Sequence, residues 1–362
     1  MRGVTASYWK GRRVLVTGHT GFKGSWLSFW LTELGAEVCG FALAPATVPS
    51  LFELLALEDR LRHEVGDLRQ PEGIRRVVDD FRPQAVLHLA AQPIVLTSYE
   101  DPAGTFASNV MGTAHLLDAL RASGSASVCV VVTSDKCYEN REQVWGYREC
   151  DALGGRDPYS ASKGCQEIVT ASYRASFFHP DRRGDHGLSL ASGRAGNVIG
   201  GGDWGAFRLV PDLMQAFAED EPAVVRNPGS VRPWQHVIEP LRGYLALAEA
   251  ADADPSHATA YNFGPAETDT AEVRTLADAL VARWGGTARW EDRGDPNARH
   301  EAGLLRLDTS LARHRLGWKP AMALADTVEA TVDWYRAHAK GASPTELAAL
   351  TAQQLGRWGG AT

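Results

Sequence analysis

The sequence has few of the features that mark secreted, membrane or nucleic-acid-binding proteins. Its 362 residues carry a formal net charge of −7 and contain no basic run, which excludes a footprint for a phosphate backbone. The five cysteines are odd in number and show no CxxC spacing, so neither a disulfide framework nor a metal site is expected. No window reaches the about 18 apolar residues of a membrane span, and the first residues lack an apolar signal core. We therefore expect a cytoplasmic protein without a membrane or nucleic-acid partner.

Apolar runs alternate with helical patterns along the first half of the chain. Strands are predicted at 14–16, 37–43, 85–91, 127–134 and 188–192. Helices are predicted over 25–34, near 72–81 and 105–122, and from 159 to 178. Strands that alternate with helices in this way are typical of an α/β fold with a Rossmann-type, doubly wound parallel sheet.

The composition changes after about residue 196. The segments GNVIGGGDWGAFRLVPD and RNPGSVRPWQHVIEP are rich in Gly, Pro, Trp and Arg, as expected of irregular segments that hold a ligand. We predict a cofactor-binding domain over 8–195 and a smaller, irregular substrate-binding region over 196–338, interleaved with it. An amphipathic helix is predicted over 324–338, and the tail over 339–362 is expected to be a loosely docked arm.

Three glycines at intervals of three, Gly18, Gly21 and Gly24, lie between the first predicted strand and the helix that follows it. Glycines at the start of a helix let a pyrophosphate approach free N–H groups and the positive end of the helix dipole. An ordinary tight turn is the alternative, and the flanking strand and helix argue against it.

The segment DPYSASKG places Tyr159 and Lys163 four residues apart, and hence on one helix face. Beside a positively charged nicotinamide, such a tyrosine has its phenol pKa lowered from about 10 toward neutrality and can act as a general base. A surface pair that arose by chance is the alternative.

The segment VVTSDKCYE ends a buried strand, so Thr133, Ser134, Asp135 and Lys136 are expected at its carboxyl end. In an open parallel sheet ligands bind at these ends, which places the four residues in the same crevice as the glycine turn. An acid next to an amine can serve there as proton donor and acceptor. A solvated ion pair is the alternative.

These segments, together with HLAAQ, RAGNVIGGGDW, RPWQHV and NFGP, resemble the extended short-chain dehydrogenase/reductase family. Within that family they are similar to the 4,6-dehydratases that act on CDP-hexoses, and the likeness runs in order from about residue 8 to about residue 336. The resemblance implies an NAD-dependent internal redox reaction on a nucleotide diphosphate sugar. CDP-D-glucose would become CDP-4-keto-6-deoxy-D-glucose.

The resemblance also implies a role for each matching residue. Tyr159, assisted by Lys163, would take the proton of the sugar 4-hydroxyl, while Ser134 would hydrogen-bond the 4-oxygen. Asp135 would be the acid and Lys136 the base of the elimination. Besides Tyr159 and Lys163, the implied cofactor contacts are Gly18, Thr20, Gly21, Phe22, Lys23, Gly24, Asp67, Leu68, Leu89, Ala90 and Ala91. The implied substrate contacts are Gln92, Asn197, Arg208, Arg232 and His300.

Two positions depart from the family pattern. Ala44 stands where the family has an acid for the adenosine ribose, so NAD is expected to bind more weakly than usual. Leu96 stands where related sequences have an arginine near the sugar. Another nucleotide-sugar isomerase on the same scaffold therefore stays open, an epimerase or a pyranose/furanose mutase that need not use NAD, as does a non-catalytic binding protein. The resemblance suggests a homodimer, or a dimer of dimers, built on the helices near 105–122 and 160–178.

Overall fold

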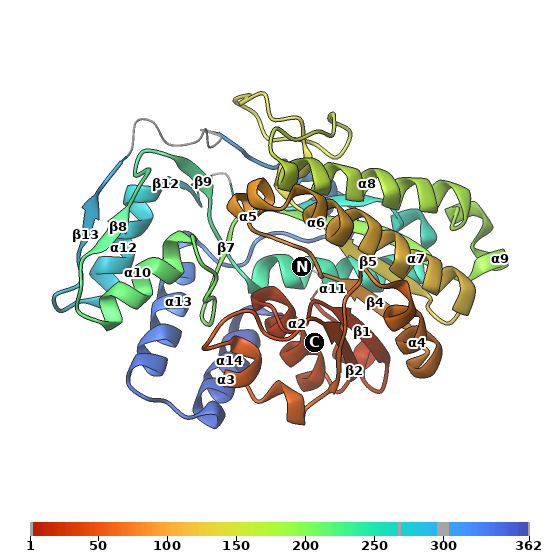
Figure 1. Cartoon of the computed structure of the whole chain (residues 1–362), viewed down its shortest axis with the longest axis horizontal. Coiled ribbons are helices and arrows are strands. Elements are labelled where there is room, and N and C mark those ends of the chain that lie inside the picture. Colours follow the sequence, from red (N-terminus) through yellow and green to blue (C-terminus); the bar gives the residue numbers. More distant parts are fainter. Residues whose placement is uncertain (1–2, 267–268, 295–303, 361–362) are drawn as a thin grey trace.

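The computed structural model describes residues 3–266, 269–294 and 304–360 of the chain. Its centre is a parallel seven-stranded sheet with the strand order β11-β6-β5-β4-β1-β2-β3 (Figure 1). The strands are β1 (Arg13–Thr17), β2 (Glu37–Ala42), β3 (Arg62–Val65), β4 (Ala85–His88), β5 (Val128–Val132), β6 (Ser189–Ala195) and β11 (Ala260–Phe263). The predicted doubly wound sheet is thus confirmed, and β3 and β11 are strands that the sequence did not indicate.

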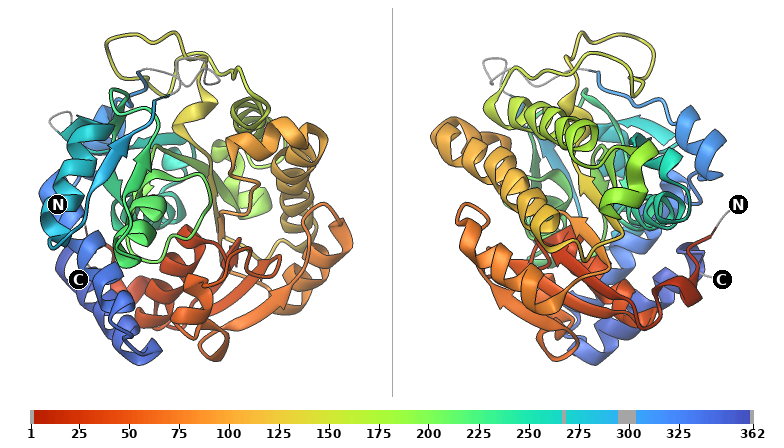
Figure 2. Two further views of the ribbon diagram at one scale, coloured as in Figure 1. Left: turned by 60° about the vertical axis from the view of Figure 1, so that its left-hand side comes forward. Right: turned by 90° about the vertical axis from the view of Figure 1, so that its right-hand side faces the viewer.

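Helices cover both faces of the sheet (Figure 2). One face packs against α2 (Phe22–Glu33) and α11 (Ile238–Ala253), and the other against α4 (Pro71–Phe81), α7 (Gly112–Ser123) and α8 (Pro158–Ser176). Side chains alternate along β1, so that Val14 and Val16 belong to the first core and Leu15 to the second. Among the described residues, no helix combines the length and the apolar character that a membrane span requires.

The strand order reverses at β1, which pairs with β2 on one side and with β4 on the other. In doubly wound sheets this reversal opens a crevice at the carboxyl ends of the strands. The helix predicted near 105–122 begins in α6 (Pro102–Phe106), passes through a π-helical turn at Ala107–Met111 and continues as α7. The shorter helices are α1 (Ala6–Trp9), α3 (Leu51–Leu54), α5 (Val95–Glu100) and α9 (Arg183–His186).

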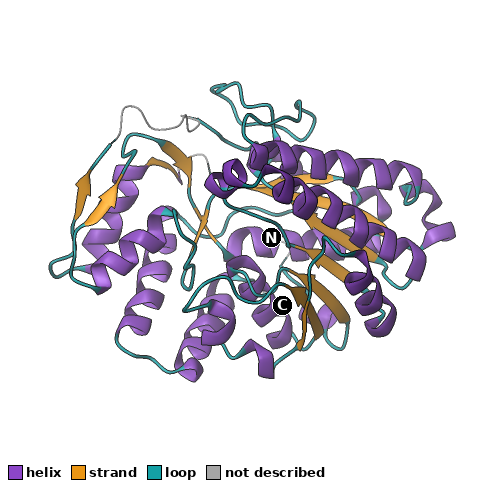
Figure 3. Ribbon diagram, viewed as in Figure 1, coloured by secondary structure: helices purple, strands orange, loops and turns teal. Residues whose placement is uncertain are grey.

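Residues beyond β6 form a smaller lobe beside the sheet, at the left of Figure 1. Its helices are α10 (Leu209–Ala218), α12 (Val273–Trp284) and α13 (Leu324–Ala339). Its strands are short and pair two by two (Figure 3): β7 (Val198–Ile199) with β10 (Gln235–His236), β9 (Val231–Pro233) with β12 (Thr270–Glu272), and β8 (Ala223–Val225) with β13 (Trp290–Asp292). Between these elements, α11 and β11 return to the main sheet.

The last part of the chain is not a loosely docked arm, so that expectation is wrong. It forms α14 (Pro344–Trp358), which contacts α2, α3 and α13. Trp334 Nε1 on α13 donates a hydrogen bond to Thr351 Oγ1 at 3.1 Å. The buried residues of α14 are Leu347, Ala348, Thr351, Gln354 and Leu355.

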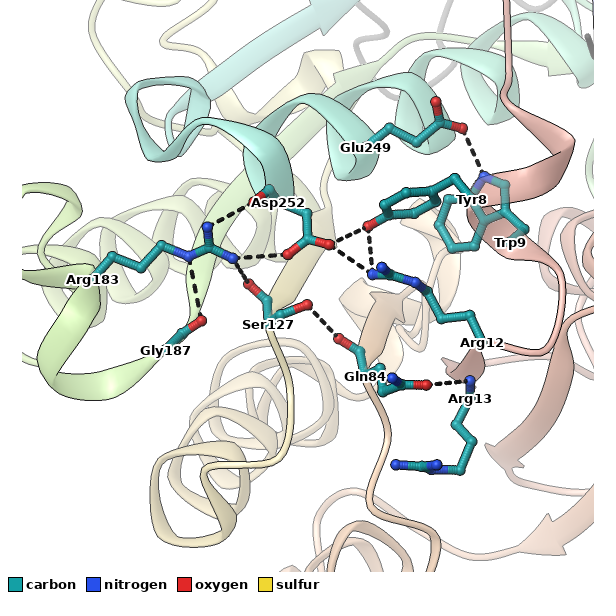
Figure 4. A network of polar contacts seen from close by, with 10 residues as sticks. All are labelled: Tyr8, Trp9, Arg12, Arg13, Gln84, Ser127, Arg183, Gly187, Glu249 and Asp252. Atoms are coloured by element: carbon teal, nitrogen blue, oxygen red, sulfur yellow. Dashed lines mark hydrogen bonds and ion pairs between the residues drawn. The ribbon is translucent and has the colours of Figure 1, made fainter.

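The N-terminal segment is fixed to α11 by a polar network around Asp252 (Figure 4). The Asp252 carboxylate accepts a hydrogen bond from Tyr8 Oη at 2.8 Å and pairs with Arg12 at 2.7 Å and with Arg183 at 2.8 Å. Burial favours the neutral acid, but the hydrogen bonds and the Arg12 charge prevail and hold the pKa of Asp252 below its usual range. The network therefore ties the approach to β1 to a helix on the face of the sheet.

Candidate active site

A cleft of about 1800 Å³ opens at the carboxyl ends of the central strands and extends into the smaller lobe. Every site residue predicted from the sequence lines this cleft, apart from His300, which lies outside the described residues. Ala44 and Leu96 line it as well. The structure thus gathers into one cavity segments that are far apart along the chain.

The glycine turn brings backbone groups close together at one end of the cleft. Gly18 has a φ of +76°, and a Cβ there would lie 2.7 Å from Ala90 N. Gly24, in the first turn of α2, packs so tightly against the Gly18 carbonyl that no side chain fits. Gly21 is the N-cap of α2 and makes no side-chain capping bond. This cradle, which a Cβ would fill, fits the pyrophosphate of a dinucleotide at a helix N-terminus.

The wall beyond the glycine turn carries the residues predicted near the adenosine. Asp67 forms an ion pair with Arg69 at 2.6 Å, and the hydrogen bond from Arg69 holds the Asp67 pKa below its usual range. Thr20 Oγ1 donates to Leu43 O at 2.9 Å at the end of β2. Ala44 follows directly and has no oxygen to offer a ribose hydroxyl. The chain therefore lacks a carboxylate at that position of the cleft.

The strand-end segment and the start of α8 meet in the middle of the cleft. Asp157 caps α8 by accepting a hydrogen bond from Ser160 N at 2.9 Å, which fixes the first turn of the helix and with it Tyr159. Tyr159 hydrogen-bonds Ser134, yet burial raises the pKa of its phenol to about 12. The phenol alone is therefore an acid rather than a base at neutral pH.

Asp135 is the buried acid of the site, with a side chain only 3% exposed. It accepts a hydrogen bond from Ser134 Oγ at 2.9 Å. Burial raises its pKa, and the positive charges of Lys136 and Lys23 oppose that rise. A Cβ at Gly196 would lie 2.8 Å from Asp135 Oδ2, which explains a glycine at that position. A carboxyl with a raised pKa beside a hydroxyl and two amines can give and take protons.

Lys163 lies one turn along α8 from Tyr159, as predicted. Its Nζ donates to Gln166 Oε1 at 2.9 Å and to Val132 O at 3.4 Å. Burial, followed by the nearby charge of Lys23, lowers the Lys163 pKa to about 7. Gln166 Nε2 in turn donates to Thr113 Oγ1 at 2.8 Å. A chain of buried hydrogen bonds thus orients the lysine.

Another buried network, which the sequence did not indicate, lies behind the strand-end segment. Glu167 on α8 pairs with Arg194 on β6 at 2.9 Å and accepts a hydrogen bond from Thr133 Oγ1 at 2.5 Å. Arg194 also donates to Tyr138 Oη at 2.7 Å. The network holds Thr133, which precedes Ser134, and Tyr138, which follows Lys136 by two residues, so it fixes the segment at both ends. An arginine inside a strand whose residues are all buried was the available signal for it.

The predicted substrate-binding residues come from both parts of the chain. Arg208 is held by Asp203, both of whose carboxylate oxygens accept from its Nη1, at 3.0 and 2.8 Å. Arg232 lies on β9, and its charge opposes the rise in the pKa of Asp135. Gln92 Nε2 donates a hydrogen bond to Thr105 Oγ1 at 2.9 Å. The two arginines add positive charge to the cleft on the side of the smaller lobe, where an anionic ligand can bind.

A doubly wound parallel sheet that carries a glycine turn, a strand-end Ser-Asp-Lys segment and a Tyr/Lys helix pair at one cleft defines the class of the extended short-chain dehydrogenases/reductases. A family model described as GDP-mannose 4,6 dehydratase matches residues 15–331, and the chain belongs to that family. The chain is 49% identical over 339 residues to the CDP-glucose 4,6-dehydratase of Salmonella typhimurium, covering 93% of this chain and 94% of the relative. It is 31% identical to a dTDP-glucose 4,6-dehydratase of Streptomyces griseus, covering 90% of this chain and 94% of the relative.

Solved structures share the fold at lower identity. A UDP-glucose-4-epimerase from Stenotrophomonas maltophila with bound NAD has a TM-score of 0.78 at 23% identity, covering 91% of this chain and 99% of that one. A dTDP-glucose 4,6-dehydratase from Streptomyces venezuelae with NAD bound has a TM-score of 0.74 at 23% identity, covering 90% and 97%. Dehydratases and epimerases therefore share this fold, and the fold alone does not distinguish them.

Proposed function

We propose that this chain is an NAD-dependent nucleotide-sugar 4,6-dehydratase, a lyase that converts CDP-D-glucose to CDP-4-keto-6-deoxy-D-glucose. The observation that carries the proposal is the buried acid Asp135, placed beside Ser134 and Lys136 at the end of β5. A dehydratase needs an acid for a departing hydroxyl, whereas an epimerase does not. The 49% identity to a protein named CDP-glucose 4,6-dehydratase supports the same reaction and the same sugar nucleotide.

Each residue of the site then has a defined task. Tyr159 takes the proton of the 4-hydroxyl, and Ser134 hydrogen-bonds the 4-oxygen as it becomes a carbonyl. NAD, which the glycine turn of Gly18, Gly21 and Gly24 would hold, would supply the hydride acceptor and donor that this internal redox reaction needs. Lys136 removes the C5 proton, which the 4-keto group has acidified, while Asp135 protonates the 6-hydroxyl so that it leaves as water. Lys163 orients the tyrosine and the cofactor.

The cofactor is held mainly by the glycine turn, in this proposal. Ala44 supplies no charge-assisted hydrogen bond to the adenosine ribose, so we infer weaker NAD binding than in relatives with an acid there. The same absence removes the repulsion that excludes a 2′-phosphate. A dehydratase regenerates NAD in each turnover, so weak retention slows the enzyme only where free NAD is scarce.

Product analysis tests the proposal. The protein is incubated with NAD and with CDP-, dTDP-, UDP- and GDP-linked hexoses in parallel, and the products are examined by mass spectrometry. Loss of one water from CDP-glucose is the expected result, and the Tyr159→Phe variant is the control, in which conversion should be about 100-fold slower or more. An unchanged mass with altered retention would mean an isomerase. If no sugar nucleotide is converted, the result would indicate a non-catalytic binding protein.

We further infer a homodimer that forms through the helical face made by the end of α6, the π-helical turn, α7 and α8. Phe106, Met111 and Ile168 expose 36%, 49% and 57% of their surface there, which is unusual for large apolar side chains. Light scattering after size exclusion should give twice the monomer mass of 39.2 kDa. A monomer at micromolar concentration would contradict the inference.

All five cysteines lie in the described ranges and are free, which supports a reducing, cytoplasmic compartment.

A further inference from the structure

Beyond Arg208 the cleft continues between α10 and the end of β8. Phe207, Asp212, Val224 and Arg226 line this part. Phe207 has a φ of +62° and Val224 is a strand residue, yet both expose apolar side chains, by 60% and 41%. A bulky residue rarely adopts a positive φ, and such strain tends to occur at ligand sites. This end of the cleft is therefore apolar on its faces and charged on its edge.

Asp212 is placed one helical turn from Arg208. The Asp212 N–H donates to Arg208 O at 3.1 Å, so both residues lie on the same side of α10 at its start. Asp212 is exposed to the cleft, where partial loss of water contact raises the pKa of its carboxyl and the positive charge of Arg226 opposes that rise. A carboxylate and a guanidinium thus act on each other at the wall of the cleft, next to the arginine that faces the proposed diphosphate.

We propose that Asp212 and Arg226 read the edge of the nucleotide base and select cytosine. The proposal rests on the function proposed above and specifies its substrate. Arg208, Asp212 and Arg226 line the same end of the cleft, so a nucleotide whose diphosphate is held by Arg208 can place its base beside the Asp212 carboxylate. Asp212 is then a specificity-determining residue and takes no part in the chemistry at the sugar.

Hydrogen-bond complementarity favours cytosine over the other pyrimidines. Cytosine presents the N4 amino group as a donor beside the N3 acceptor, and a carboxylate next to a guanidinium offers the matching acceptor and donor. Uracil and thymine present the O4 acceptor beside the N3–H donor, which places acceptor against acceptor at Asp212. Phe207 and Val224 contact the faces of the ring, which all bases share, and so give affinity without selection.

The test compares CDP-glucose with UDP-glucose in wild type and in Asp212→Asn. An asparagine amide can donate to O4 as well as accept from N4, so the ratio of the two kcat/KM values should fall about 10-fold to 100-fold. The matched control is Asp79→Asn on α4, an exposed aspartate outside the cleft, which should leave the ratio unchanged. Calorimetric titration with CDP and UDP measures the same preference without turnover.

Each outcome decides the proposal. An unchanged CDP to UDP preference in Asp212→Asn, or a wild type that prefers UDP- or GDP-sugars, overturns it. Arg226→Met is the second variant, and it should weaken CDP binding more than UDP binding, with equal losses counting against the assignment. If wild type binds CDP selectively but converts no sugar, the proposed function fails while the base assignment stands.

Discussion

Replacing Glu167 by glutamine tests whether the buried ion pair behind the cleft holds the strand-end segment in place. Glu167 and Arg194 are 3% and 4% exposed. The Glu167 carboxylate accepts from Arg194 Nη2 at 2.9 Å, from Ser192 Oγ at 2.8 Å and from Thr133 Oγ1 at 2.5 Å. Glutamine has nearly the same shape but no charge, and its NH₂ group faces groups that are themselves donors.

The free energy of unfolding should fall by about 3 kcal/mol. Removing one partner of a buried ion pair costs about 3–5 kcal/mol, because the other charge stays buried without compensation. We expect the lower end, since Arg194 keeps its hydrogen bond to Tyr138 Oη. Thr133 directly precedes Ser134 and Asp135, so kcat of the proposed reaction should fall as well.

Urea unfolding of wild type and Glu167→Gln at neutral pH measures the effect. The double variant Glu167→Leu/Arg194→Met, which removes both charges, should be more stable than Glu167→Gln alone. A Glu167→Gln protein whose free energy of unfolding lies within about 1 kcal/mol of the wild-type value would refute the reasoning.

The pH dependence provides a further check, because the partners of Glu167 hold its folded-state pKa below its usual range despite its burial. The stabilisation is therefore present above about pH 4.3 and lost as pH falls through the folded-state pKa, so acid should reduce the difference between the two proteins.

Three further substitutions test the site. Tyr159→Phe should lower turnover about 100-fold or more with little change in CDP binding by calorimetry, and near wild-type activity would remove the base from that residue. Asp135→Asn should slow water loss far more than exchange of the C4 hydrogen, measured with deuterated sugar; equal losses would make Asp135 a positioning residue. Ala44→Asp should tighten NAD binding about 10-fold to 150-fold in calorimetry, whereas unchanged affinity would mean that other groups hold the ribose.

Periodicity located the central strands because most of their residues are buried and many are apolar, as in Val128–Val132. It failed for β3, an edge strand with the sequence RHEV in which no residue is fully buried. It also failed for β11, a four-residue strand that follows a long excursion through the smaller lobe. For such strands the partner strand, and not the local pattern, decides the structure.

The site was predictable where residues follow the ends of parallel strands, because those ends meet at one edge of the sheet. Gly18 after β1 and Ser134 after β5 line one cleft for this reason. The partners of these residues were not predictable, since Gln166 orients Lys163 and Glu167 braces Thr133 only after α8 has packed on the sheet. The closeness of Asp212 on α10 to Arg226 was not predictable either, because Arg226 follows β8 and comes near Asp212 only after the smaller lobe has folded.

The protonation state of Tyr159 shows what the chain achieves without a ligand. Burial raises its pKa to about 12 and lowers that of Lys163 to about 7, so the same cause pushes both groups toward their neutral forms. With a pKa of about 7, Lys163 is only partly charged at neutral pH and stabilises a tyrosinate less than a fully protonated lysine would. If Tyr159 is the base of the proposed reaction, the positive charge of a bound nicotinamide would have to lower the pKa of its phenol from about 12 toward neutrality.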